Sequence, residues 1–252
     1  SPHVRSPETT TGIMLDVIIS LIPALAASVW LFGLRTLLVT ATTVLSCMLS
    51  EFFSRKIMKR QGTLGDLSAI VTGILAFNLP ATIPLWVAAI GSVVAIVVVK
   101  QFFGGIGQNF VNPALVGRIV LMASFPTMMS TWVQPFAWRG VQVVTTASPL
   151  ASISSMFTAG DVAAATASNP ALPSLWQMLI GQRQGSLGEV CALALLLGFA
   201  YLLIRRVITP VIPLTYIGTV AVIMLIAGKG SLSFVAYEIL GGGLLLGAIF
   251  MA

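Results

Sequence analysis

Long apolar stretches, separated by short polar or proline-containing segments, dominate the chain. A helix that crosses a lipid bilayer needs about 17 to 25 mostly apolar residues, and several of these stretches meet or approach that length. They lie at about residues 11–33, 36–53, 67–80, 85–103, 110–130, 187–204, 207–227 and 232–252. The pattern predicts an all-α fold, a polytopic integral membrane helical bundle with about eight visible spans.

The stretch at residues 67–80 is shorter than a comfortable crossing. Residues 67–99 contain no charge, and Pro80 and Pro84 divide this region into two helices. A half-helix that ends at membrane depth is tolerated where it lines a cavity within the protein. The segment therefore predicts either a full crossing or a half-helix of this kind.

The basic residues are distributed unevenly between the predicted loops. With the N-terminus in the cytoplasm, the loops alternate so that eight Lys and Arg lie inside and four outside. The inner set is Arg5, Arg55, Lys56, Lys59, Arg60, Lys100, Arg205 and Arg206, and the outer set is Arg35, Arg139, Arg183 and Lys229. This bias predicts a cytoplasmic N-terminus in a multi-pass protein of a bacterial or archaeal inner (cytoplasmic) membrane.

The same topology divides the chain into three parts. Residues 1–130 form a first membrane region, residues 131–186 form an extracytoplasmic loop rich in Ser, Thr, Ala and Pro, and residues 187–252 begin a second membrane region. A loop of that length is uncommon as a simple connection and is often functional.

Composition agrees with a membrane protein. Hydrophobic residues make up 57% of the 252 residues and charged residues 8%, against about 25% charged residues in a soluble domain. The net charge of +6 therefore reflects basic cytoplasmic loops, and no nucleic-acid partner is predicted. Cys47 and Cys191 lie in apolar runs without a ligand spacing, so the sequence predicts no metal site.

A glycine-rich block precedes the fifth predicted span. Glycines at 104, 105 and 107 are followed by Gln108, Asn109 and Asn112, and Pro113 comes next. Glycines permit close approach of a ring or phosphate, and a helix N-terminus offers free N–H groups. The alternative is a plain glycine turn with an Asn cap and Pro in the first helical turn.

Several charged residues lie within or near the spans. Arg118 is expected to face a partner, a cavity or a ligand, because a guanidinium group is costly in a membrane. Glu238, inside the last span, is the candidate carboxylate for an ion path or for pairing with Arg118. The carboxylates near span ends are expected to cap helices or to be solvated at the interface. These are Asp16, Glu51, Asp66 and Glu189.

Three stretches together resemble one family. They are Ser1-Pro-His-Val-Arg5, the run from Gly65 to Pro80, and Gly104-Gly-Ile-Gly-Gln-Asn109 with Asn112-Pro-Ala114. They resemble the D subunit of the Rnf complex, an ion-translocating ferredoxin:NAD⁺ oxidoreductase, and are similar to the B subunit of the sodium-translocating NADH:quinone oxidoreductase. The resemblance implies about ten spans in two five-helix repeats, of which roughly the last two are absent here.

The resemblance also implies a covalent FMN. In the family, a flavin transferase links FMN through its phosphate to a hydroxyl residue in a Ser/Thr-Gly-Ala-Thr-Pro-Leu pattern. The matching stretch here is Thr145-Thr-Ala-Ser-Pro-Leu150, which aligns Ser148 with the acceptor and leaves Thr146 and Thr145 as alternatives. Thr146 stands where Gly is usual and Ser148 where Thr is usual. An ordinary Ser-Pro turn is the alternative interpretation.

A second flavin, a noncovalent riboflavin, is implied near the glycine-rich block. Its expected contacts are Gly104, Gly105, Gly107, Gln108, Asn109, Asn112 and Arg118. The resemblance therefore implies an electron-transfer subunit of a Na⁺- or H⁺-translocating complex. Such a subunit is not catalytic alone. Its expected partners are membrane lipid and the other Rnf subunits, including an FMN-bearing G-type subunit and iron–sulfur subunits. The competing hypothesis is a secondary transporter or channel without a redox cofactor, and a third is a purely structural membrane anchor.

Overall fold

The chain is almost entirely helical. In the computed structural model the described part of the chain comprises residues 9–59, 65, 67–140, 145–146, 173–241 and 243–251. The one sheet in that part is an antiparallel pair of two-residue strands, β1 (Trp132–Val133) and β2 (Thr145–Thr146). The predicted all-α class is therefore confirmed.

Helices α1 (Thr10–Phe32) and α2 (Arg35–Ile57) are each 23 residues long. Both are long and apolar enough to cross a bilayer, and both match predicted spans. The side chain of Thr9 accepts a hydrogen bond from the Gly12 backbone N–H, which caps the first turn of α1. Gly33, with φ 78°, turns the chain into α2.

The remaining predicted spans are shorter or interrupted helices. In chain order the elements are α3 (Ser68–Thr72), the 3₁₀ helix η2 (Gly73–Asn78), α4 (Leu85–Val93), the π-helix η3 (Val94–Gln101), α5 (Pro113–Ser124), α6 (Pro126–Met129), the 3₁₀ helix η4 (Ala137–Arg139), α9 (Leu175–Ile180), α10 (Ala192–Ile204), α11 (Val211–Ala227), α12 (Leu232–Gly241) and α13 (Leu244–Phe250). Helices α12 and α13 are bent by 62° and could form one broken span. The count of about eight spans stays a prediction.

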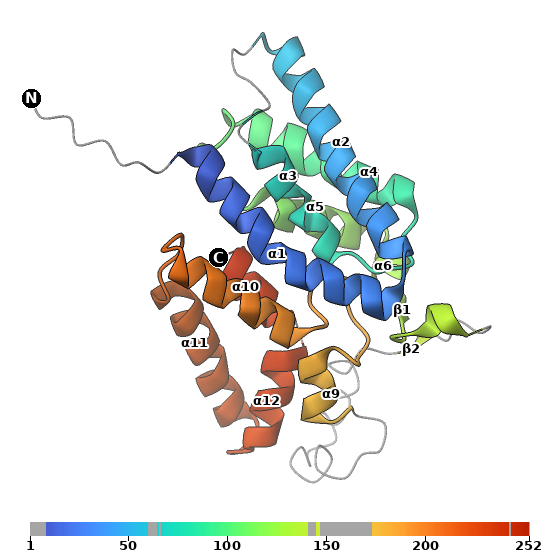
Figure 1. Ribbon diagram of the computed structural model, residues 1–252, viewed down its shortest axis with the longest axis vertical. Helices are drawn as coiled ribbons and strands as arrows, with labels where there is room; N and C mark the ends of the chain where they lie inside the picture. Colours follow the sequence, from blue (N-terminus) through green and yellow to red (C-terminus); the bar gives the residue numbers. More distant parts are fainter. Residues whose placement is uncertain are drawn as a thin grey trace, which may run out of the picture.

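Helix α1 lies between two groups of helices. It packs on α10 along one side and on α2 and α3 along the other, while α2 packs on α4 and η3, and α5 packs on α4 and η3 (Figure 1). The close contact of α1 with α10 depends on Gly198. A Cβ atom built there would overlap the Ser20 carbonyl oxygen, so only glycine fits without movement.

A polar contact joins the same two helices. Asp16 of α1 accepts hydrogen bonds from the Tyr201 hydroxyl at 2.9 Å and from Arg205 Nε at 3.2 Å. The expectation that Asp16 caps a helix or is solvated was wrong. The carboxylate instead links α1 to α10, because close helix packing brings basic and hydroxyl partners to it.

The segment after α6 returns to the turn between α1 and α2. The Phe136 N–H donates to the Leu31 carbonyl oxygen at 2.7 Å, and the Trp138 ring packs against Gly33. Arg35 donates from Nε to the Ala81 carbonyl oxygen at 2.9 Å. These contacts gather the α1–α2 turn, the α3–α4 connection and residues 132–139 at one end of the bundle.

Candidate polar centre and flavin-attachment region

Arg118 lies where interrupted helices meet. From α5 its Nη1 donates to Asn78 Oδ1 at 2.7 Å and lies 3.8 Å from Glu189 Oε2. Asn78 is the last residue of the 3₁₀ helix η2 and is buried. The expectation that Arg118 faces a partner is confirmed, but the carboxylate beside it is Glu189. Glu238 lies half-buried on α12.

The connection between α9 and α10 carries Glu189 into the interior. The Leu187 N–H donates to the Leu79 carbonyl oxygen at 3.0 Å, and the Gly188 N–H donates to the Phe77 carbonyl oxygen at 2.9 Å. Glycine is required at 188, because an added Cβ would overlap the Phe77 side chain. Backbone pairing with the segment around η2 therefore fixes this connection in the core.

Glu189 and Arg183 are both buried in this connection. Glu189 Oε1 accepts from the Ser186 N–H at 3.0 Å. Arg183, only 2% exposed, donates to the Gly241 and Glu189 carbonyl oxygens at 2.8 and 2.6 Å. The sequence predicted an external Arg183 and a solvated or capping Glu189. The expectation for Glu189 was wrong, because the backbone contacts of residues 187–188 pull this segment inward. The placement of Arg183 on the outer side of the membrane stays a prediction.

The glycine-rich block forms the turn between η3 and α5. Gly104, Gly105 and Gly107 have φ of 122°, 102° and 78°, which favour glycine. The Asn112 side chain accepts from the Ala114 and Leu115 N–H groups, and Pro113 opens α5. The predicted Asn cap and first-turn proline are confirmed.

Two of the side chains that were expected to contact a flavin already donate hydrogen bonds to backbone groups. Asn109 Nδ2 donates to the Val111 carbonyl oxygen at 2.8 Å, and Asn112 Nδ2 donates to the Met251 carbonyl oxygen at 3.4 Å. Gln108 and the backbone at Gly104 and Gly107 are exposed. A flat ligand approaching this block would therefore meet exposed backbone and Gln108 first. The flavin contacts of the block stay a prediction.

The predicted flavin-attachment motif, residues 145–150, lies mostly outside the described residues. Ser148 falls there, so its assignment stays a prediction. Thr145 and Thr146 form β2, and they pair with Val133 and Trp132 respectively. The beginning of the motif is thus anchored to the segment that follows α6, at the same end of the bundle as the α1–α2 turn.

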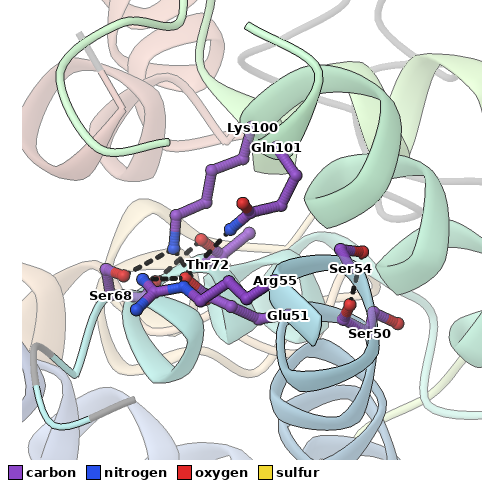
Figure 2. A network of polar contacts seen from close by, with 8 residues as sticks. All are labelled: Ser50, Glu51, Ser54, Arg55, Ser68, Thr72, Lys100 and Gln101. Carbon is purple, nitrogen blue, oxygen red and sulfur yellow. Dashed lines mark hydrogen bonds and ion pairs between the residues drawn. The ribbon is translucent and has the colours of Figure 1, made fainter. Parts of the chain in front are cut away.

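The sequence did not predict a second buried polar network, shown in Figure 2. Glu51 of α2 is completely buried and accepts from Lys100 Nζ at 2.8 Å and from Gln101 Nε2 at 3.1 Å. Arg55 pairs with the same carboxylate, and Lys100 also donates to Ser68 Oγ. The expectation that Glu51 is solvated or caps a helix was wrong. The placement of Lys100 on the cytoplasmic side stays a prediction.

The π-helix η3 explains part of this network. It ends in Lys100 and Gln101, and both side chains point to Glu51 (Figure 2). A π-helix is rare and recurs at functional positions. Its widened turn gives two successive residues access to one buried carboxylate. The available sequence signal was a carboxylate and a lysine, each placed within or beside a long apolar run.

Comparison with known proteins identifies the family. The family described as "NQR2, RnfD, RnfE family" matches residues 1–252. The chain belongs to this family. The match covers the helices that form the polar centre and also the predicted flavin-attachment motif, so the resemblance inferred from the three sequence stretches is confirmed.

Three relatives within this family are similar over all of the chain. The D subunit of the Na⁺-translocating ferredoxin:NAD⁺ oxidoreductase complex of Acetobacterium woodii is 43% identical over 100% of this chain and 74% of the relative. The D subunit of the proton-translocating ferredoxin:NAD⁺ oxidoreductase complex of Clostridium ljungdahlii is 38% identical over 100% and 76%. The D subunit of the ion-translocating oxidoreductase complex of Halorhodospira halophila is 36% identical over 100% and 77%.

Proposed function

We propose that this chain is the flavin-carrying electron-transfer subunit of an ion-translocating ferredoxin:NAD⁺ oxidoreductase complex. The family match over residues 1–252 carries the proposal, and the names of its D-subunit relatives supply the activity. The chain acts as one membrane subunit and is not catalytic alone. Its partners are the other Rnf subunits, including an FMN-bearing G-type subunit and iron–sulfur subunits.

The covalent FMN is attached through its phosphate to Ser148, with Thr146 and Thr145 as alternative acceptors. A phosphoester requires only a hydroxyl group, and the motif supplies three such side chains. Pairing of β2 with β1 supports the proposal, because it holds the backbone of the motif's first residues beside residues 132–133. A bound FMN supplies one- and two-electron transfer, while the protein positions the ring.

A noncovalent riboflavin is proposed beside the glycine-rich block. The positive φ angles of Gly104 and Gly107, and their exposure, permit a ring to approach the backbone closely. Gln108 is exposed and can donate and accept hydrogen bonds. Asn109 and Asn112 shape the turn, since their side chains bond to backbone groups.

Peptide mass spectrometry of the subunit, produced together with a flavin transferase, tests the covalent site. The expected result is an FMN phosphoester on the peptide that contains Ser148, lost in Ser148→Ala. Loss in Thr146→Ala or Thr145→Ala instead would move the acceptor. Absence of any flavin in the denatured subunit would contradict the proposal.

The second candidate function is a secondary transporter or channel. One observation favours it: interrupted helices converge on buried charged side chains, an arrangement that transporters use for ion sites. Ion movement by the isolated subunit without any redox partner would support this candidate. Flavin attachment at the motif would favour the electron-transfer subunit.

A further inference from the structure

Three interruptions of helical structure meet around Arg183 and Glu189. They are the 3₁₀ helix η2 with the extended residue Leu79, the connection from Gly181 to Cys191, and the bend between α12 and α13 at Gly243. Unwound backbone at such points leaves carbonyl oxygens without helical partners, and membrane transporters use these oxygens to bind cations.

The oxygen atoms here would suit a monovalent cation. They include the carbonyl oxygens of Gly241 and Glu189, the amide oxygen of Asn78 and the carboxylate of Glu189. Carboxylate, amide and backbone oxygens are the donors that hard cations prefer. The oxygens come from segments far apart in the sequence, and they lie in the interior of the bundle.

Two guanidinium groups already occupy these positions. Arg183 donates to both backbone carbonyl oxygens, and Arg118 donates to Asn78 and lies beside the Glu189 carboxylate. With Glu189 ionised, the two arginines leave this cluster with one excess positive charge. A further cation entering the cluster would be repelled by both groups.

Two glycines pack closely against the Glu189 carboxylate. A Cβ atom built on Gly243 would overlap Glu189 Oε2, and one built on Gly185 would lie 3.0 Å from Glu189 Oε1. Arg183 Nε, Ser186 Oγ and Glu189 Oε2 are buried and make no hydrogen bond within the described part of the chain. The carboxylate is therefore closely packed on the side of these two glycines, while three buried polar atoms of the cluster keep hydrogen-bonding capacity.

We propose that the guanidinium groups of Arg183 and Arg118 occupy an oxygen-lined site that a free cation would otherwise enter. In this way they seal a potential pathway for ion leakage through the centre of this subunit. Removal of the Arg183 guanidinium would leave buried carbonyl and carboxylate oxygens with a cavity beside them. Buried polar cavities hold water, and carboxylate and carbonyl oxygens are ligands for hard cations. Ions moved by the complex accordingly do not pass through this cluster in the intact protein.

Passive Na⁺ entry into proteoliposomes containing the whole complex, without an electron donor, tests the seal. Arg183→Ser is expected to raise the entry rate about tenfold or more, the factor for a barrier lowered by about 1.4 kcal/mol. Guanidinium ion added to the medium should slow this leak by refilling the cavity. Arg183→Ser with Glu189→Gln should leak less, because the carboxylate that attracts the cation is gone.

Lys229→Ser is the matched control, since it removes one positive charge from an exposed turn and should not leak.

Arg118→Gln is the second variant, because Arg118 is partly exposed and Gln can still donate to Asn78. This variant should leak as well. Tight vesicles with either assembled arginine variant would overturn the proposal, and Arg118→Gln decides alone if Arg183→Ser does not assemble. Flavin content, measured separately by mass, reports on the proposed function and not on the seal.

Discussion

At the scale of single residues, two buried carboxylates are neutralised in different ways. Glu51 is surrounded by Lys100, Arg55 and Gln101, so its charge is fully paired and hydrogen-bonded. One carboxylate oxygen of Glu189 accepts a hydrogen bond from the Ser186 backbone N–H. The other oxygen lies 3.8 Å from Arg118 Nη1. A buried pair is costly to break, because removing one partner leaves an uncompensated charge.

Glu51→Gln is expected to lower stability strongly. The substitution leaves Lys100 buried without its carboxylate, and breaking a buried pair in this way costs about 3–5 kcal/mol. The thermal unfolding midpoint in detergent measures the effect. Adding Lys100→Met should recover part of the loss, because the unpaired ammonium group is then removed as well.

Glu238→Gln is the control for this prediction, since the half-buried Glu238 lies outside the network. It should change the unfolding midpoint far less than Glu51→Gln. Equal midpoints for the two variants would show that the network around Glu51 contributes little to stability.

At the scale of helices, glycines set how closely the elements approach. Gly198 lets α10 contact the backbone of α1 at Ser20, and Gly117 lies near the Gly91 carbonyl oxygen where α5 packs on α4. Small residues at helix contacts are typical of membrane bundles, because backbone approach replaces the hydrophobic effect as the source of packing energy.

Gly198→Ala is expected to destabilise the protein by about 1–3 kcal/mol, the usual cost of inserting atoms into a tight core. The added methyl group would overlap a backbone oxygen, which cannot rotate away as a side chain could. Chemical unfolding in mixed micelles measures the change.

Gly218→Ala on α11 provides the comparison, because nothing lies within 4 Å of its Cβ position. It should be neutral or stabilising by up to about 1 kcal/mol through helix propensity. If Gly198→Ala were as well tolerated as Gly218→Ala, the α1–α10 contact would have to be adaptable.

At the scale of the whole molecule, the bundle has two distinct ends. Residues 132–139 lie at the α1–α2 turn through the Phe136–Leu31 hydrogen bond, whereas Lys56 lies at the far end of α2. The structure thus places Arg139 and Lys56 at opposite ends of the same helix. The distribution of basic residues then predicts which end faces the cytoplasm.

Cysteine labelling tests this orientation. In a background with Cys47 and Cys191 replaced by Ala, Arg139→Cys should react with an impermeant maleimide in intact cells. Lys56→Cys should react only after permeabilisation. Both parent side chains are exposed, so a reversed pattern would mean a reversed topology, and burial would not explain it.

The sequence alone determined the helical class, the positions of most helices, the Asn112–Pro113 helix start and the family. These features depend on local apolar runs, on capping residues and on contiguous motifs, which neighbouring residues specify. Only the tertiary structure decided which charges are buried. Glu51 meets Lys100 across 49 residues, and Arg183 meets Gly241 across 58, so no local pattern distinguishes these charges from solvated ones at a span end. Their state depends on partners that folding brings together, because a charge leaves water only where distant oxygen atoms or opposite charges replace its hydration.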